Sequence, residues 1–199
     1  MYKLMKFTLL FAVAIAFTRN YVAAVQGMRC RKQDLKWIDE LTCEVPPNCI
    51  DLVLPDKEIG TYPGVAIFKA LDEHPRIQRI YVQKNRLGPK AALALVETLE
   101  DLQSVEVVNL DNNNIGDEGA EAFATLLASN HPMSELSLNN NHISNIGARA
   151  LVEALQYNTN LKTLFFFQND DVSNGFEMKL SYSFLISDCE FLYVCRYLR

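Results

Sequence analysis

Acidic and amide side chains between residues 111 and 118 are the part of this sequence whose types and spacing come nearest to a chemical site. Asp117 and Glu118 are neighbouring carboxylates, as a general acid–base pair would require. They stand at the start of an alanine-rich segment, however, where carboxylates complement the dipole of a beginning helix. Asp111–Asn114 offers oxygen ligands but lacks the bidentate acid that closes a calcium loop. We therefore expect a helix start here, with no catalytic residues, no bound metal and no cofactor.

The rest of the chain also lacks the residue patterns of an enzyme. It contains no G-x-S-x-G nucleophile motif, no phosphate-binding glycine loop and no H-E-x-x-H zinc motif. Its three histidines form no cluster. With 19 basic and 24 acidic residues the formal charge is -5. This balance disfavours nucleic acid as a partner, because phosphate binding needs a concentrated basic face.

The first 24 residues have the order of features found in a secretory signal peptide. Lys3 and Lys6 precede an apolar run, Phe7–Phe17, and small residues then lead to a cleavage point after Ala24. Eleven apolar residues are too few to cross a bilayer, which takes about 20. We expect residues 1–24 to be a signal peptide and the protein to be secreted, without a transmembrane segment. The alternative is an apolar segment that is never removed from a cytoplasmic protein.

The remaining chain repeats itself every 28 residues. Equivalent segments begin at Cys49, Ile77, Val105, Met133 and Leu161. Each begins with apolar residues in the spacing L-x-x-L-x-L, typical of a short strand with one buried face. The spacing A-x-x-L-x-x-x-L follows and predicts a helix with one apolar stripe. Only stacked copies can bury both, so we expect an α/β solenoid of about four to five units, with parallel strands on its concave side and helices on its convex side.

The motif L-x-x-L-x-L-x-x-N-x-I/L-x-x-x-G at this period resembles the leucine-rich repeats of the ribonuclease-inhibitor type. The resemblance covers residues 49–175, with 25–48 as an N-terminal cap and 176–199 as an irregular C-terminal cap or a truncated tail. It implies a horseshoe-like fold and, for this class, binding of a protein partner without catalysis.

Two alternatives come from relatives of this repeat type. One is a regulatory fragment related to small-GTPase activators or immune receptors. The other is an actin-binding protein, since the segment 158–180 is loosely similar to the C-terminal repeat region of tropomodulins, which cap actin filaments.

Four asparagines recur at one position of the repeat: Asn85, Asn113, Asn141 and Asn169. An amide there can point inward and bond backbone groups that are freed where the strand turns. Buried backbone groups must find hydrogen-bond partners, so we expect these asparagines to be structural. Three other asparagines fall at different repeat positions and should face the turn or solvent: Asn112, Asn114 and Asn140.

Residues that alternate with the buried strand positions should face the open side of the arc. From these we predict a partner-binding set: Arg79, Tyr81, Asn109, Asp111, Glu135, Asn139, Phe165 and Phe167. Tyr81 beside Arg79 is an aromatic–guanidinium pair of the kind enriched at binding hot spots, although both could simply be solvated. Phe165 and Phe167 would form an apolar contact patch unless the following chain covers them.

The segment before the repeats contains two of the five cysteines, Cys30 and Cys43. Leu35, Ile38 and Leu41 recur at helical spacing, which predicts a short capping helix. Cys49 falls at an inward position of the first repeat and should act there as a small apolar side chain. We therefore expect the disulfide to join Cys30 and Cys43.

Overall fold

The computed structural model describes residues 28–39 and 42–169 of the chain. The predicted signal peptide, residues 1–24, lies outside the described residues, as does the predicted C-terminal region 176–199. The described part contains most of the segment before the repeats and nearly all of the repeat array.

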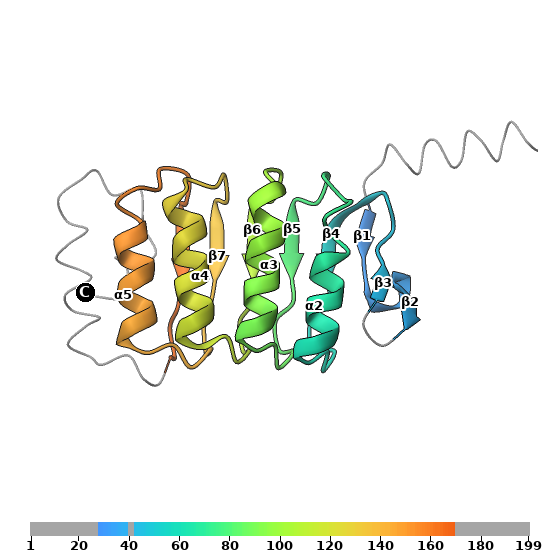
Figure 1. Ribbon diagram of the computed structural model, residues 1–199, viewed down its shortest axis with the longest axis horizontal. Helices are drawn as coiled ribbons and strands as arrows, with labels where there is room; N and C mark the ends of the chain where they lie inside the picture. The colour runs from blue at the N-terminus through green and yellow to red at the C-terminus, as the bar shows by residue number, and fades with distance from the viewer. Residues whose placement is uncertain (1–27, 40–41, 170–199) are drawn as a thin grey trace, which may run out of the picture.

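One six-stranded sheet organises the structure, and all of its neighbouring strands are parallel (Figure 1). Its order is β1-β4-β5-β6-β7-β8, so the strands of the repeats follow one another in chain order. The strands are β1 (Met28–Cys30), β4 (Cys49–Val53), β5 (Arg79–Tyr81), β6 (Val107–Asn109), β7 (Glu135–Ser137) and β8 (Thr163–Phe165).

A helix follows each of the strands β4 to β7, and all four helices lie along one face of the sheet (Figure 1). They are α2 (Thr61–Lys69), α3 (Pro89–Asp101), α4 (Gly116–Ala128) and α5 (Asn145–Ala154). Pro89 suits the first position of α3, where no backbone N–H is needed, and Ser144 caps α5 by accepting a hydrogen bond from the Ile146 N–H. The predicted α/β solenoid is confirmed.

The core lies between the sheet and the helix layer. Equivalent strand residues 28 positions apart are almost completely buried there: Leu52, Ile80, Val108, Leu136 and Leu164. Neighbouring helices also approach closely, since a Cβ added at Gly147 would lie 2.8 Å from the Ala120 Cβ. Each unit therefore buries its apolar face against the next unit, as a solenoid requires.

The four recurring asparagines are buried and bridge neighbouring units. Asn113 Oδ1 accepts hydrogen bonds from the N–H groups of Asn85 and Leu87, at 3.0 Å each. Its Nδ2 donates to the carbonyl oxygens of Val82 at 3.1 Å and Leu110 at 2.8 Å. The side chains of Asn85, Asn141 and Asn169 likewise bond backbone groups of their own unit and of the preceding one. These amides hold the turns after the strands at a fixed spacing.

The turns beside these asparagines use the left-handed backbone region. It recurs at one repeat position, with φ between 53° and 60° at Asp56, Lys84, Asn112, Asn140 and Gln168. Asparagine tolerates this region better than most residues. In the run of three asparagines at 112–114, Asn112 thus adopts the left-handed turn conformation and Asn113 is the buried bridging residue.

The segment before the repeats forms strands rather than the predicted helix. β2 (Lys36–Asp39) pairs antiparallel with β3 (Thr42–Glu44), after a short 3-10 helix, η1 (Lys32–Asp34). The helix prediction from Leu35, Ile38 and Leu41 is therefore wrong. Three apolar residues span too short a helix to be stable without strong packing, and the local sequence contains tryptophan and isoleucine, which favour strands.

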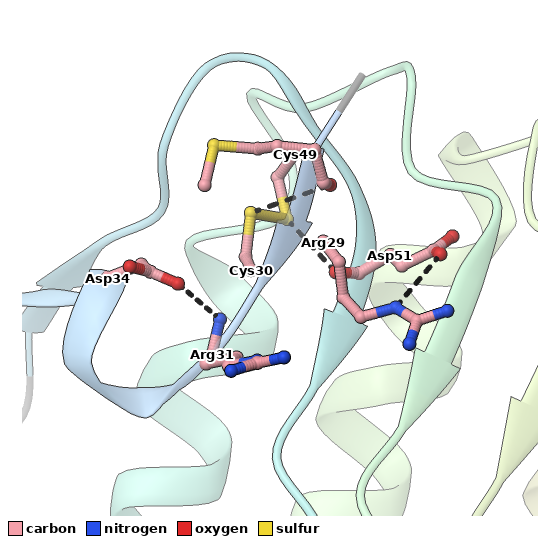
Figure 2. The surroundings of a disulfide bond; sticks show 7 residues. Arg29, Cys30, Arg31, Asp34, Cys49 and Asp51 are labelled. Carbon is pink, nitrogen blue, oxygen red and sulfur yellow. Dashed lines mark hydrogen bonds and ion pairs between the residues drawn. A yellow bond between two sulfur atoms is a disulfide. The ribbon is translucent and has the colours of Figure 1, made fainter. Parts of the chain in front are cut away.

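The disulfide prediction is also wrong, because Cys30 is bonded to Cys49 (Figure 2). Strand β1 adds to the edge of the sheet beside β4, and the Cα atoms of the two cysteines lie 5.7 Å apart. Cys43 lies instead in the β2–β3 hairpin as a buried free thiol. Burial raises the pKa of the Cys43 thiol to about 11. Cys49 is fully buried as expected, but as half of the disulfide.

A buried histidine between two units predicts a pH dependence of stability. His131 Nδ1 accepts the Met133 N–H at 3.2 Å and its Nε2 lies 3.3 Å from the Leu102 carbonyl oxygen, an arrangement that fits the neutral ring. Burial lowers the pKa of His131 below its ordinary value of 6.5, against the opposing hydrogen bonds to Leu102 and Leu99. The unfolded chain therefore takes up a proton more readily. The contribution of neutral His131 to stability is therefore complete above about pH 6.5 and is lost as the pH falls through the lowered pKa.

Replacing His131 with Asn should reduce the loss of stability at low pH. The measurement is the slope of the free energy of unfolding against pH, between about pH 7 and 5. His142→Asn is the matched control, because His142 is exposed and its φ of 58° suits asparagine. Partial burial also lowers the pKa of His74, so some slope should remain in His131→Asn. Equal slopes in the two variants would contradict the assignment to His131.

Candidate protein-binding surface

Among the described residues no helix covers the second face of the sheet, which we call the open face (Figure 1). The parallel register aligns the residues that point to it in two rows across the strands. The first row contains Asp51, Arg79, Val107, Glu135 and Thr163, and the second contains Val53, Tyr81, Asn109, Ser137 and Phe165. A third row follows just beyond the strand ends: Pro55, Gln83, Asp111, Asn139 and Phe167.

All eight residues of the predicted partner-binding set lie in these rows, and each is partly exposed. They come from four neighbouring units, so the structure brings them onto one continuous surface. Two other members of the rows, Asp51 and Ser137, are buried at 6% and 2% exposure. Their side chains are held by their neighbours, as the following contacts show.

The middle of the open face is a hydrogen-bonded network around Asp111. Its Oδ1 accepts the Ser137 hydroxyl at 2.6 Å and the Asn139 N–H at 2.9 Å. Asn139 Oδ1 in turn accepts the Phe167 N–H at 2.7 Å. Asn109 Oδ1 accepts the Asp111 N–H at 3.0 Å. These polar groups hold one another in place, which makes this part of the surface rigid before any partner arrives.

A charged cluster lies at the β1 end of the open face. Arg79 donates two hydrogen bonds to Asp51, from Nε to Oδ1 at 2.7 Å and from Nη2 to Oδ2 at 3.3 Å. These bonds raise the pKa of Arg79 above its ordinary value, so the guanidinium stays charged. Arg29 of β1 adds an ion pair, with Nε 3.6 Å from Asp51 Oδ2 (Figure 2).

The predicted partner-binding set includes Arg79 but neither Asp51 nor Arg29, which lie beside it in this cluster. Asp51 stands 28 residues before Arg79, a spacing that places the two side by side on adjacent strands, so the signal was present. Arg29 precedes the repeats. The 28-residue period does not extend to its segment, so the sequence does not predict that this segment forms a strand of the same sheet.

Aromatic rings gather at the β8 end of the open face. The ring centroids of Phe165 and Phe167 lie 6.5 Å apart at an interplanar angle of 53°. Phe166 points away from the open face and is 9% exposed, and its ring is parallel to that of Phe167 at 6.4 Å. Both open-face rings are half-buried, and the chain that follows them from residue 170 lies outside the described residues.

Asp117, one of the two carboxylates at the start of α4, is part of the scaffold. Asp117 Oδ1 accepts the N–H groups of Ser144 at 2.8 Å and Gly147 at 3.0 Å, and its Oδ2 accepts the Ser144 hydroxyl at 2.6 Å. Partial burial alone would raise the pKa of Asp117, but these hydrogen bonds outweigh it and hold the pKa below its ordinary value. Asp117 thus links the start of α4 to the start of α5.

Two negative findings apply to the described residues only. No group of three or more histidine, cysteine, aspartate or glutamate side chains there could hold a metal ion. None of the helices in that part of the chain has the length and apolar character needed to span a bilayer.

The family comparison agrees with the geometry. A family model described as Leucine Rich repeat matches residues 101–124 and 129–152, two segments that begin 28 residues apart, as the strands and helices do. These two segments are leucine-rich repeats, and the fold around them is a leucine-rich-repeat solenoid. Its units, each with a full helix opposite a short strand, are of the ribonuclease-inhibitor type. No curated protein sequence is significantly similar to it.

Solved structures share the fold of this leucine-rich-repeat protein. One is of leiomodin-1 actin-binding site 2, with 21% identity, a TM-score of 0.60, and 68% of this chain and 79% of that chain covered. Another is the tropomodulin C-terminal domain of Caenorhabditis elegans, with 16% identity, a TM-score of 0.54, and 75% and 86% covered. At these identities the likeness shows the fold alone.

Proposed function

We propose that this leucine-rich-repeat protein is a non-catalytic module that binds a protein partner on its open face. The supporting observation is that partly exposed residues of four neighbouring units form one surface on the open face, which no helix covers in the part of the chain that the structure describes. The Asp111 network and the asparagine bridges fix this surface, and a rigid surface loses little entropy on binding.

Tyr81→Ala tests the proposal, because Tyr81 lies in the second row between Val53 and Asn109 and is partly exposed. We expect this variant to recover a cellular partner about tenfold less well than the unmodified protein in quantitative affinity capture. Tyr62→Ala is the matched control: the same side chain is removed from α2, where Tyr62 is 63% exposed on the helix side. Equal recovery of the partner by both variants would move the site away from the open face.

Actin is a second candidate partner, favoured by the actin-binding site among the solved structures of this fold. Co-sedimentation with actin filaments tests it directly. If actin is the partner, the protein pellets with filaments and Tyr81→Ala reduces the pelleted fraction. Protein that stays in the supernatant at every filament concentration would eliminate this candidate.

Export from the cell is a separate part of the proposal and competes with the actin candidate. The Cys30–Cys49 disulfide suits an oxidising compartment, and residues 1–24 have the features of a signal peptide. A tagged full chain should then appear outside the cell, shortened at its N-terminus. Retention inside the cell at full length would contradict export and leave actin as the stronger candidate.

A further inference from the structure

The charged cluster at the β1 end of the open face has its negative charge covered and its positive charges exposed. The Asp51 side chain is 9% exposed, whereas the side chains of Arg79 and Arg29 are 42% and 61% exposed. Asp51 lies between the two guanidinium groups, on the strand that separates β1 from β5. A molecule that approaches this end of the open face therefore meets guanidinium groups first.

Arg79 is held in one orientation while part of its guanidinium stays available. Its bonds to Asp51 use Nε and one N–H of Nη2, which leaves both N–H groups of Nη1 and one of Nη2 outside the pair. A planar guanidinium fixed in this way is suited to a carboxylate, because fewer side-chain rotations are lost when the second pair forms. The carboxylate of Glu106, on the next unit, is exposed and also attracts Arg79.

Apolar surface borders the arginines. Val107 is the register partner of Arg79 on β6, and Tyr81 pairs with Val53 in the second row. All three of these side chains are partly exposed. A partner that brings a carboxylate to the arginines would place its neighbouring side chains on this apolar surface.

We propose that the β1–β4–β5 end of the open face binds an acidic segment of the protein partner. An Asp or Glu carboxylate of that segment pairs with Arg79 and Arg29, and an adjacent apolar side chain packs on Val53 and Tyr81. This inference rests on the proposed function and specifies the chemistry of the partner.

A displayed library of random peptides, selected on the full chain, tests the inference. Enriched peptides should carry Asp or Glu within a few residues of an aromatic or aliphatic residue. Their affinity should fall about tenfold in Arg79→Gln and also fall in Arg29→Gln and with added salt. Arg79→Lys should bind more weakly than the unmodified protein, because lysine keeps the charge but loses the planar fork.

Arg86→Gln is the matched control. It removes one positive charge from the same unit, but Arg86 pairs with Glu58 in an exposed turn, and its side chain is 76% exposed. Its effect on peptide affinity should be less than about twofold. Arg79→Gln leaves buried Asp51 with fewer partners, so thermal unfolding of each variant must be measured to show that it is still folded. Arg29→Gln tests the same recognition at a more exposed side chain, where a loss of stability is not expected.

The outcomes separate the two proposals. If the enriched peptides are neutral or basic and their binding still depends on Tyr81, the inference of an acidic segment is overturned and the proposed function stands. Binding unchanged by both Tyr81→Ala and Arg79→Gln would overturn both. A library without any binder would also overturn the inference, since recognition of a linear acidic segment must be detectable in isolated peptides.

Discussion

Replacing Asn113 with Ala should lower the free energy of unfolding by about 3–5 kcal/mol, a large part of the stability of an ordinary domain. The substitution leaves the buried N–H groups of Asn85 and Leu87 without an acceptor, and the carbonyl oxygens of Val82 and Leu110 with one donor fewer. An unpaired buried polar group costs about 1–3 kcal/mol, and the cost is not fully additive for neighbours.

Urea unfolding followed by circular dichroism measures this change, and Asn114→Ala is the matched control. Asn114 is the next residue in the chain and carries the same side chain, but it is exposed. Its replacement should change the free energy by no more than about 0.5 kcal/mol. Similar losses in the two variants would mean that the amide bridges do not stabilise the stack.

Reduction of the Cys30–Cys49 disulfide should destabilise the protein by about 3 kcal/mol. The bond closes a loop with a sequence separation of 19 and ties the edge strand β1 to the first repeat strand β4. Without it, the unfolded chain gains conformational freedom. The expected observation is a lower urea midpoint in the presence of a reductant.

Two cysteine variants and a peptide map check the disulfide assignment. Cys43→Ala should show the same loss on reduction, because Cys43 is not part of the bond, whereas Cys49→Ala should show none. A non-reduced digest should contain the Cys30 peptide joined to the Cys49 peptide. A peptide that joins Cys30 to Cys43 would refute the assignment.

The edge strand also links stability to the proposed recognition. β1 contributes Cys30 to the disulfide and Arg29 to the open face, on adjacent residues (Figure 2). Loss of the disulfide should therefore weaken binding of acidic peptides as well as stability, because it frees the strand that positions Arg29.

The repeat made many tertiary contacts predictable from the sequence. In a stack of identical units, the neighbour of a residue lies at a fixed sequence distance, so adding 28 to a residue number names its partner. Asn85 and Asn113 are joined in this way, as are the strand positions of Ile80 and Val108. The alternation of each strand then decided which side chains point to the helices and which point to the open face.

The segment before the repeats could not be predicted by the same reasoning. Leu35 and Ile38 have a spacing that fits a helix, yet the segment forms the β2–β3 hairpin. Local propensity is weak in so short a segment, and packing against the first repeat decides its structure. The pairing of Cys30 was misjudged for the same reason, because disulfide connectivity depends on which cysteines the folded chain brings together.

The sequence by itself determined the solenoid, its register, the inward asparagines and the strand residues of the open face, since all of these follow from one periodic pattern. Only the tertiary structure decided that β1 completes the sheet, that Cys30 bonds Cys49, and that Arg29 joins the pair of Asp51 and Arg79. The physical reason is that these contacts join the array to a segment outside it. No period relates the two, and only burial and geometry in three dimensions select their partners.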